Sequence, residues 1–118
     1  MYTITKTFEF SASHSLTHLP ENHPCHRLHG HNYVLKVELK SEELDPKTKM
    51  VKDYRELAKI KNYVDKYLDH KNLNDVFPFP TTSENMAKWL FEIFKEWYPQ
   101  LSAVELSETP KTNCRYES

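Results

Sequence analysis

The chain is organised around one concentrated stretch, Cys25-His26-Arg27-Leu28-His29-Gly30-His31. The residues that follow alternate polar and apolar side chains, which predicts a strand: Asn32-Tyr33-Val34-Leu35-Lys36-Val37-Glu38-Leu39. Side chains two positions apart in a strand point to the same face, roughly 7 Å from one another. His29 and His31 can therefore hold one ion between them if a neighbouring element supplies a third ligand.

Composition narrows the class of protein. A chain of 118 residues with a net charge of −1 and no basic tail predicts one domain, residues 1–118, and argues against nucleic-acid binding. We find no signal peptide at Met1–Lys6 and no apolar run long enough for a membrane span. Two cysteines without a secretion signal favour reduced thiols and a cytoplasmic location. The single glycine excludes a glycine-rich phosphate loop or a dinucleotide fingerprint.

A second long strand is predicted at Tyr2–His14, where apolar and polar residues also alternate and His14 falls on the apolar side. If this strand pairs antiparallel with the strand that begins at His29, its end lies beside that strand's start. Three imidazoles then converge on the buried face. The connection, Ser15–Leu28, is too long for a tight hairpin, and long loops in compact domains are often functional.

The remaining elements complete an α+β domain. Asp53 and Glu56 resemble a capping box that opens a helix ending near Asp69-His70, with an apolar stripe made of Tyr54, Leu57, Ile60, Val64 and Tyr67. Residues 72–80 are expected to form a loop. A second helix, capped by Thr81 or Thr82, ends before Pro99. Strands are then predicted at Leu101–Thr109 and Asn113–Glu117. This ββααββ order predicts a four-stranded antiparallel sheet with two helices on one face.

Several residues could carry chemistry. Three histidines with an open fourth position, here His14, His29 and His31, are typical of catalytic zinc. Cys25 could be a nucleophile or proton-transfer group, a fourth ligand, or an inert thiol. Asp69-His70 could be a proton relay or a solvated helix end. Glu108 continues the more apolar face of its strand, where it could pair with a lysine or accept a substrate with two parallel N–H donors.

Taken together, the motifs resemble the 6-pyruvoyltetrahydropterin synthase / 6-carboxytetrahydropterin synthase family nearly end to end. The resemblance rests on Phe8-x-Phe10-x-Ala12-x-His14, Cys25-x-x-x-His29-Gly30-His31-Asn32-Tyr33, Met50-Val51-x-Asp53-Tyr54, Leu68-Asp69-His70, Thr82-Ser83-Glu84-Asn85 and Glu108-Thr109. It implies zinc on the three histidines and a proton-transfer set of Cys25, Asp69 and His70. It also implies that Glu108 anchors the 2-amino-4-oxo edge of a pterin, with Thr82 and Arg27 as further substrate-binding candidates.

The resemblance further implies the tunnelling fold, in which sheets of several subunits join edge to edge into a barrel. Active sites then lie at subunit interfaces, and the expected homo-oligomer is a hexamer built as a dimer of trimers. The short Cys-x-x-x-His-Gly-His spacing favours the carboxy branch. That branch converts 7,8-dihydroneopterin triphosphate to a carboxypterin, acetaldehyde and triphosphate on the route to queuosine.

Three alternatives stay open: the pyruvoyl branch, a non-catalytic metal-binding protein and, more weakly, a zinc hydrolase. Two positions depart from the family pattern. Lys49 stands where the family often has glycine, and Thr81 stands where it often has proline. Neither departure is expected to touch the metal ligands or the proton-transfer set.

Overall fold

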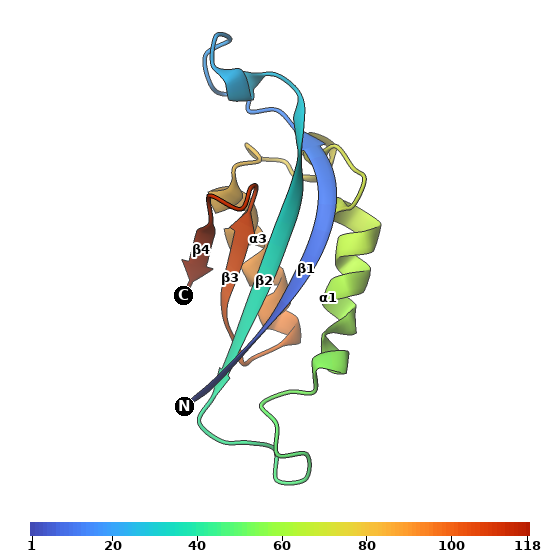
Figure 1. Cartoon of the computed structure of the whole chain (residues 1–118), viewed down its shortest axis with the longest axis vertical. Coiled ribbons are helices and arrows are strands. Elements are labelled where there is room, and N and C mark those ends of the chain that lie inside the picture. The colour runs from blue at the N-terminus through green and yellow to red at the C-terminus, as the bar shows by residue number, and fades with distance from the viewer.

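A four-stranded antiparallel sheet, covered by helices on one face, forms the protein (Figure 1). The computed structural model describes residues 1–118, and the molecule is elongated, with extents of 56 × 25 × 24 Å. The strands lie side by side in the order β1 (Tyr2–His14), β2 (His29–Ser41), β3 (Leu101–Ser107) and β4 (Cys114–Glu117). The predicted α+β architecture, a four-stranded antiparallel sheet with strands and helices in the chain order ββααββ, is confirmed.

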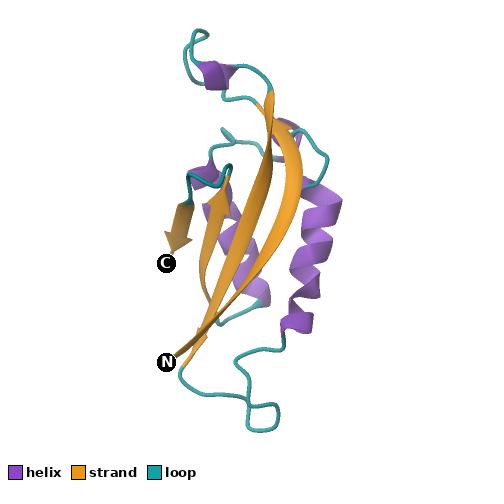
Figure 2. Ribbon diagram, in the orientation of Figure 1, coloured by secondary structure: helices purple, strands orange, loops and turns teal.

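The two longest strands, β1 and β2, form one uninterrupted ladder. Pairing runs from Tyr2 opposite Ser41 to His14 opposite His29, so the end of one strand meets the start of the other as predicted. β2 extends two residues beyond the predicted Leu39. The connection between the two strands projects beyond the sheet and contains a short 3₁₀ turn, η1 (Pro24–His26), seen at the top of Figures 1 and 2.

The helical layer covers the face that the alternation predicted to be apolar. Tyr33, Leu35, Val37 and Leu39 of β2 are all fully buried. Because successive strand residues point to opposite faces, their neighbours Lys36, Glu38 and Lys40 belong to the uncovered face. Figure 2 shows the helices on a single side of the sheet.

The first helical segment is irregular. It begins as a 3₁₀ turn, η2 (Tyr54–Leu57), continues as α1 (Ala58–Tyr63) and ends as a π-helical turn, η3 (Val64–Leu68). Asp53 caps it as predicted, accepting a hydrogen bond from the Arg55 backbone N–H at 2.9 Å. The predicted apolar stripe is wrong at both ends, since Tyr54 and Tyr67 are exposed. The wider π turn ends at Leu68, which is buried in the core as Val64 is.

The second predicted helix is α3 (Ser83–Trp97), and its cap is Thr82, whose side chain accepts from the Asn85 backbone N–H. The preceding stretch, predicted to be a loop, contains one short helical turn, α2 (Leu73–Val76). Asn72 caps that turn by accepting from the Asn74 N–H at 3.1 Å. A single turn is too short to produce an apolar period in the sequence.

β3 ends at Ser107, two residues before the predicted end, so Glu108 lies just beyond the strand. Leu39 pairs with Leu101 and Glu38 pairs with Ala103, which leaves Ser102 as an extra residue in a bulge. The bulge places Leu101 opposite Leu39, so it is buried on the helix-facing side with Val104 and Leu106, whereas Ala103 is buried opposite Glu38 on the uncovered face. The last strand begins one residue later than predicted, at Cys114.

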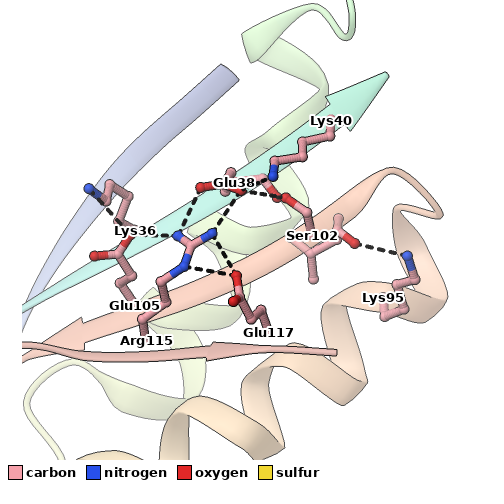
Figure 3. A network of polar contacts seen from close by, with 9 residues as sticks. Lys36, Glu38, Lys40, Lys95, Ser102, Glu105, Arg115 and Glu117 are labelled. Atoms are coloured by element: carbon pink, nitrogen blue, oxygen red, sulfur yellow. Dashed lines mark hydrogen bonds and ion pairs between the residues drawn. The ribbon is translucent and has the colours of Figure 1, made fainter. Parts of the chain in front are cut away.

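The uncovered face of the sheet carries a network of charged side chains across β2, β3 and β4 (Figure 3). Arg115 is its centre and contacts Glu38, Glu105 and Glu117. No helix in the protein combines the length and the apolar character that crossing a membrane requires.

Candidate metal centre and active site

Four side chains that can bind a metal ion converge at one end of the sheet: His14, His29, His31 and Glu108. One potential ligand atom from each lies within 4.8 Å of all the others. The β1–β2 ladder places His14 directly opposite His29, and His31 follows on the same face of β2. The predicted convergence of three imidazoles is therefore present, and the structure adds a carboxylate to it.

His14 is fully buried and its orientation is fixed by Thr81. Its Nδ1 lies 2.9 Å from the Thr81 carbonyl oxygen and 3.1 Å from Thr81 Oγ1. A carbonyl only accepts hydrogen bonds, so Nδ1 carries the proton and Nε2 presents its lone pair to the cluster. The expectation that the Thr81 departure would not touch the metal ligands is wrong, because Thr81 contacts one of them through both oxygens.

His29 is oriented in the same manner by the backbone of the loop that precedes it. Its Nδ1 lies 2.7 Å from the carbonyl oxygen of Arg27, which leaves Nε2 available as a ligand. Arg27 therefore acts on the cluster through its backbone, while its side chain is exposed at the surface.

His31 lies beside Glu108. Its Nε2 is 2.7 Å from Oε2 of Glu108, although the two groups are not aligned as a hydrogen bond. Burial, in each case the largest cause, lowers the pKa of His14 and of His31 and so favours the neutral imidazoles that metal binding requires.

The donor set fits a zinc ion. The buried Nε2 atoms of His14 and His31 have no hydrogen-bond partner, and an unpaired buried nitrogen is costly unless something binds it. Three imidazole nitrogens and one oxygen are ligands that tetrahedral zinc accepts. The backbone contacts at Nδ1 of His14 and His29 are the second layer of support that such sites typically have.

Asp69 and His70 form a pair held against the edge of β1. His70 Nδ1 lies 2.9 Å from Asp69 Oδ2, so these adjacent side chains do face each other. Asp69 Oδ1 accepts from the Ser11 N–H at 2.9 Å, and the Ser11 carbonyl accepts from the His70 N–H at 2.7 Å. The hydrogen bond from Ser11, more than the one from His70, lowers the pKa of the Asp69 carboxyl. His70 adopts a φ of 59°, a left-handed conformation that these contacts stabilise.

A recess of about 770 Å³ brings parts of the predicted site together, since His31, Asp69 and Glu108 all line it. His70 lines a neighbouring recess of about 500 Å³, which also borders His31. Another recess, of about 690 Å³, lies against residues 43–56 and contains none of the metal ligands. Cys25 lines none of these three recesses and stands outside the four-residue cluster, on η1.

Sequence reasoning missed two residues that hold the site, Thr81 and Ser83. Ser83 Oγ donates to Glu108 Oε1 at 2.8 Å, at the start of α3. The hydroxyl-rich run Thr81-Thr82-Ser83 was a usable signal, but the sequence connects it only with helix capping, a family motif and a substrate-binding role for Thr82, and not with support of the ligand cluster. Tyr33 was also missed: its buried hydroxyl has no hydrogen-bond partner, and burial, with the charge of Glu108, raises its pKa.

A one-sided antiparallel sheet, with three histidines gathered where its two long strands meet, defines an α+β protein with a candidate metal site. The chain belongs to the 6-pyruvoyl tetrahydropterin synthase family, whose model matches residues 3–118. A solved structure of the Caenorhabditis elegans 6-pyruvoyl tetrahydropterin synthase is similar, with a TM-score of 0.87 and 34% identity, covering 99% of this chain and 95% of that one.

Curated relatives extend the comparison. A 6-carboxy-5,6,7,8-tetrahydropterin synthase from Synechocystis sp. is 38% identical over 124 residues, covering 100% of this chain and 95% of the relative. A putative 6-pyruvoyl tetrahydrobiopterin synthase from Caenorhabditis elegans is 43% identical over 96 residues, covering 75% and 68% of the two chains. Similarity thus reaches both branches of the family, and a relative or structure from each branch matches nearly the whole chain, at 38% identity for the carboxy branch and 34% for the pyruvoyl branch.

Proposed function

We propose that this protein is a zinc-dependent 6-carboxy-5,6,7,8-tetrahydropterin synthase. It would convert 7,8-dihydroneopterin triphosphate to 6-carboxytetrahydropterin, acetaldehyde and triphosphate, in the biosynthesis of queuosine and other 7-deazapurines. The convergence of His14, His29 and His31, with two buried nitrogens lacking partners, carries the metal part of the proposal. The short spacing from Cys25 to His29 supports the carboxy branch, as does the 38% identity to the Synechocystis relative over the whole chain.

The chemistry divides among three groups of residues. Zinc held by the histidines would supply a Lewis acid that makes protons on the substrate side chain more acidic. Cys25 transfers one proton. His70, oriented by Asp69 at 2.9 Å, transfers another. Glu108 accepts the paired N–H groups of the pterin, since a carboxylate receives two parallel hydrogen bonds well. Thr82 and Arg27 are further candidates for contact with the substrate.

The active form is a homo-oligomer, a hexamer built from two trimers. A lone four-stranded sheet leaves open the outer edge of β4 and the part of the β1 edge that precedes Ser11, and joining these edges between copies into a barrel would satisfy their backbone groups. The Asp69–His70 pair occupies the β1 edge at Ser11, next to the open part of that edge, so active sites would lie beside the subunit junction.

Product analysis tests the proposal. The zinc-loaded protein is incubated with 7,8-dihydroneopterin triphosphate, and pterins, triphosphate and trapped acetaldehyde are quantified by mass spectrometry. We expect equal amounts of the carboxypterin and acetaldehyde. A pyruvoyl product without acetaldehyde would instead assign the pyruvoyl branch. No conversion, together with several ions bound per chain, would favour a non-catalytic metal-binding protein.

A further inference from the structure

Glu108 is held between two neighbours by its two oxygens. Oε1 accepts a hydrogen bond from Ser83 Oγ at 2.8 Å. Oε2 lies among the histidines, 2.7 Å from His31 Nε2 and 3.8 Å from His14 Nε2. The carboxylate is 28% exposed, so it reaches both the buried ligand cluster and the open recess beside it.

These contacts put the Glu108 side chain within reach of two different roles, pterin binding and metal binding. The proposed function assigns Glu108 to the pterin, but its Oε2 lies next to the nitrogens that would bind the ion. A carboxylate is itself a good zinc ligand, and an uncommitted one beside three imidazoles would close the fourth position. Something must hold Glu108 back if the site is to stay open for substrate.

Ser83 is placed to do this. It is buried, and it is the first residue of α3, directly after the cap Thr82. One residue before the cap, Thr81 is fixed against His14. The hydroxyl of Ser83 is therefore carried by backbone that is anchored on both sides. Its hydrogen bond uses one lone pair of Oε1 and leaves the other free to accept from a ligand.

We propose that Ser83 is a positioning residue that holds Glu108 toward the pterin and keeps it from becoming a permanent fourth ligand of the metal. The inference rests on the proposed function, because it requires Glu108 to bind the pterin. Without the Ser83 hydroxyl, both oxygens of Glu108 can turn to the ion. Pterin affinity then falls, while metal affinity stays the same or rises.

The experiment compares wild type with Ser83→Ala and the conservative Ser83→Thr. Ser102→Ala is the matched control, because Ser102 also donates to a glutamate at 2.8 Å, but on the uncovered face of the sheet. Zinc affinity is measured by competition with a chelating dye. The affinity of the zinc-loaded protein for neopterin is measured from the fluorescence of neopterin. We expect Ser83→Ala to weaken neopterin binding roughly tenfold without weakening zinc binding. Ser83→Thr should restore most of the neopterin affinity, and Ser102→Ala should match wild type.

Two results would overturn the inference. Neopterin affinity unchanged in Ser83→Ala would remove Ser83 from this role. A parallel loss of zinc and neopterin affinity that threonine does not rescue would mean that Ser83 only supports the fold. Failure of the proposed function is distinguished from failure of this inference by measuring neopterin binding and product formation in the wild type. If wild type binds neopterin but forms no product from the triphosphate, the function fails while the inference is still judged by Ser83→Ala. If wild type binds no neopterin, both fail.

Discussion

Glu38 and Arg115, 77 positions apart in the chain, form a two-pronged ion pair on the uncovered face of the sheet. Nη1 of Arg115 lies 2.8 Å from Glu38 Oε2, and Nη2 lies 3.0 Å from Glu38 Oε1. The pair spans from β2 across β3 to the short edge strand β4 (Figure 3). These contacts, with Ser102, lower the pKa of Glu38 from 4.5 to about 2.

This pKa shift predicts a loss of stability in acid. A carboxyl whose pKa is lower in the folded than in the unfolded state stabilises the fold above its unfolded pKa, 4.5. That contribution disappears as the pH falls toward the folded pKa, about 2. We expect Glu38→Gln to be less stable than wild type by roughly 1–3 kcal/mol at pH 7. The difference should shrink steadily between pH 4.5 and pH 2.

Denaturant unfolding at a series of pH values, at fixed protein concentration, measures this difference. Glu117→Gln is the control, because Glu117 contacts the same Arg115 but its side chain is 63% exposed. An exposed ion pair contributes little, so the control should stay within about 1 kcal/mol of wild type. A stability difference for Glu38→Gln that does not change with pH would contradict the prediction.

Metal content should depend on His29. Replacing it with alanine removes one of three nitrogen ligands, so we expect zinc affinity to fall at least about 100-fold. Wild type should bind one zinc per chain, measured by elemental analysis after dialysis against a weak chelator. His18→Ala is the control, because His18 is exposed on the connecting loop. Full zinc occupancy in His29→Ala would remove His29 from the ligand set.

Cys25→Ala should fold, keep its zinc and bind substrate, yet lose activity. General acid–base groups typically contribute about 10²- to 10⁴-fold, so the loss should appear in kcat rather than in KM. Cys114→Ala is the matched control, since Cys114 is the other free cysteine and lies on β4. Zinc content and single-turnover rates are measured side by side. Loss of zinc in step with activity would make Cys25 a ligand, and full turnover would make it inert.

Mixing two inactive variants tests whether sites are shared between subunits. His29→Ala lacks a metal ligand, and His70→Ala lacks half of the Asp69 pair. Suppose that each site takes its metal ligands from one subunit and its Asp69–His70 pair from the neighbouring subunit. A site is then complete only where a His70→Ala subunit supplies the ligands and a His29→Ala subunit supplies the pair, so random mixing in equal amounts restores about a quarter of the sites. The measurement is turnover after the variants are unfolded and refolded together. No recovery, with mixed oligomers verified by mass spectrometry, would place each site within one chain.

Alternating polar and apolar residues correctly predicted the features of this protein that depend on regular strands. The period of two in Tyr2–His14 and in the strand from His29 fixed which side chains are buried, and so brought three histidines together. The prediction failed where the backbone is irregular. The π turn at Val64–Leu68 and the bulge at Ser102 each change the period by one residue, and no single residue type marks either.

The support of the candidate site was also beyond sequence reasoning. Thr81 and Ser83 act through side-chain and backbone contacts with residues 67 and 25 positions away. No periodicity connects such distant residues. Lys49 is the contrasting case: it stands where the family often has glycine, and its φ of 62° is a conformation that favours glycine. The glycine of the family pattern therefore indicates a left-handed backbone conformation at this position, which a lysine by itself does not indicate.

The two proposed ligands His14 and His29 flank the whole connection between β1 and β2, so an ion held by both would act as a removable cross-link around residues 15–28. A covalent cross-link around a loop of about 15 residues lowers the chain entropy of the unfolded state by roughly 3 kcal/mol. The ion would bring the two longest strands together at their loop end, from which pairing can proceed in register toward Tyr2 and Ser41. Zinc supply would then govern how quickly newly made chains fold, before any substrate is bound.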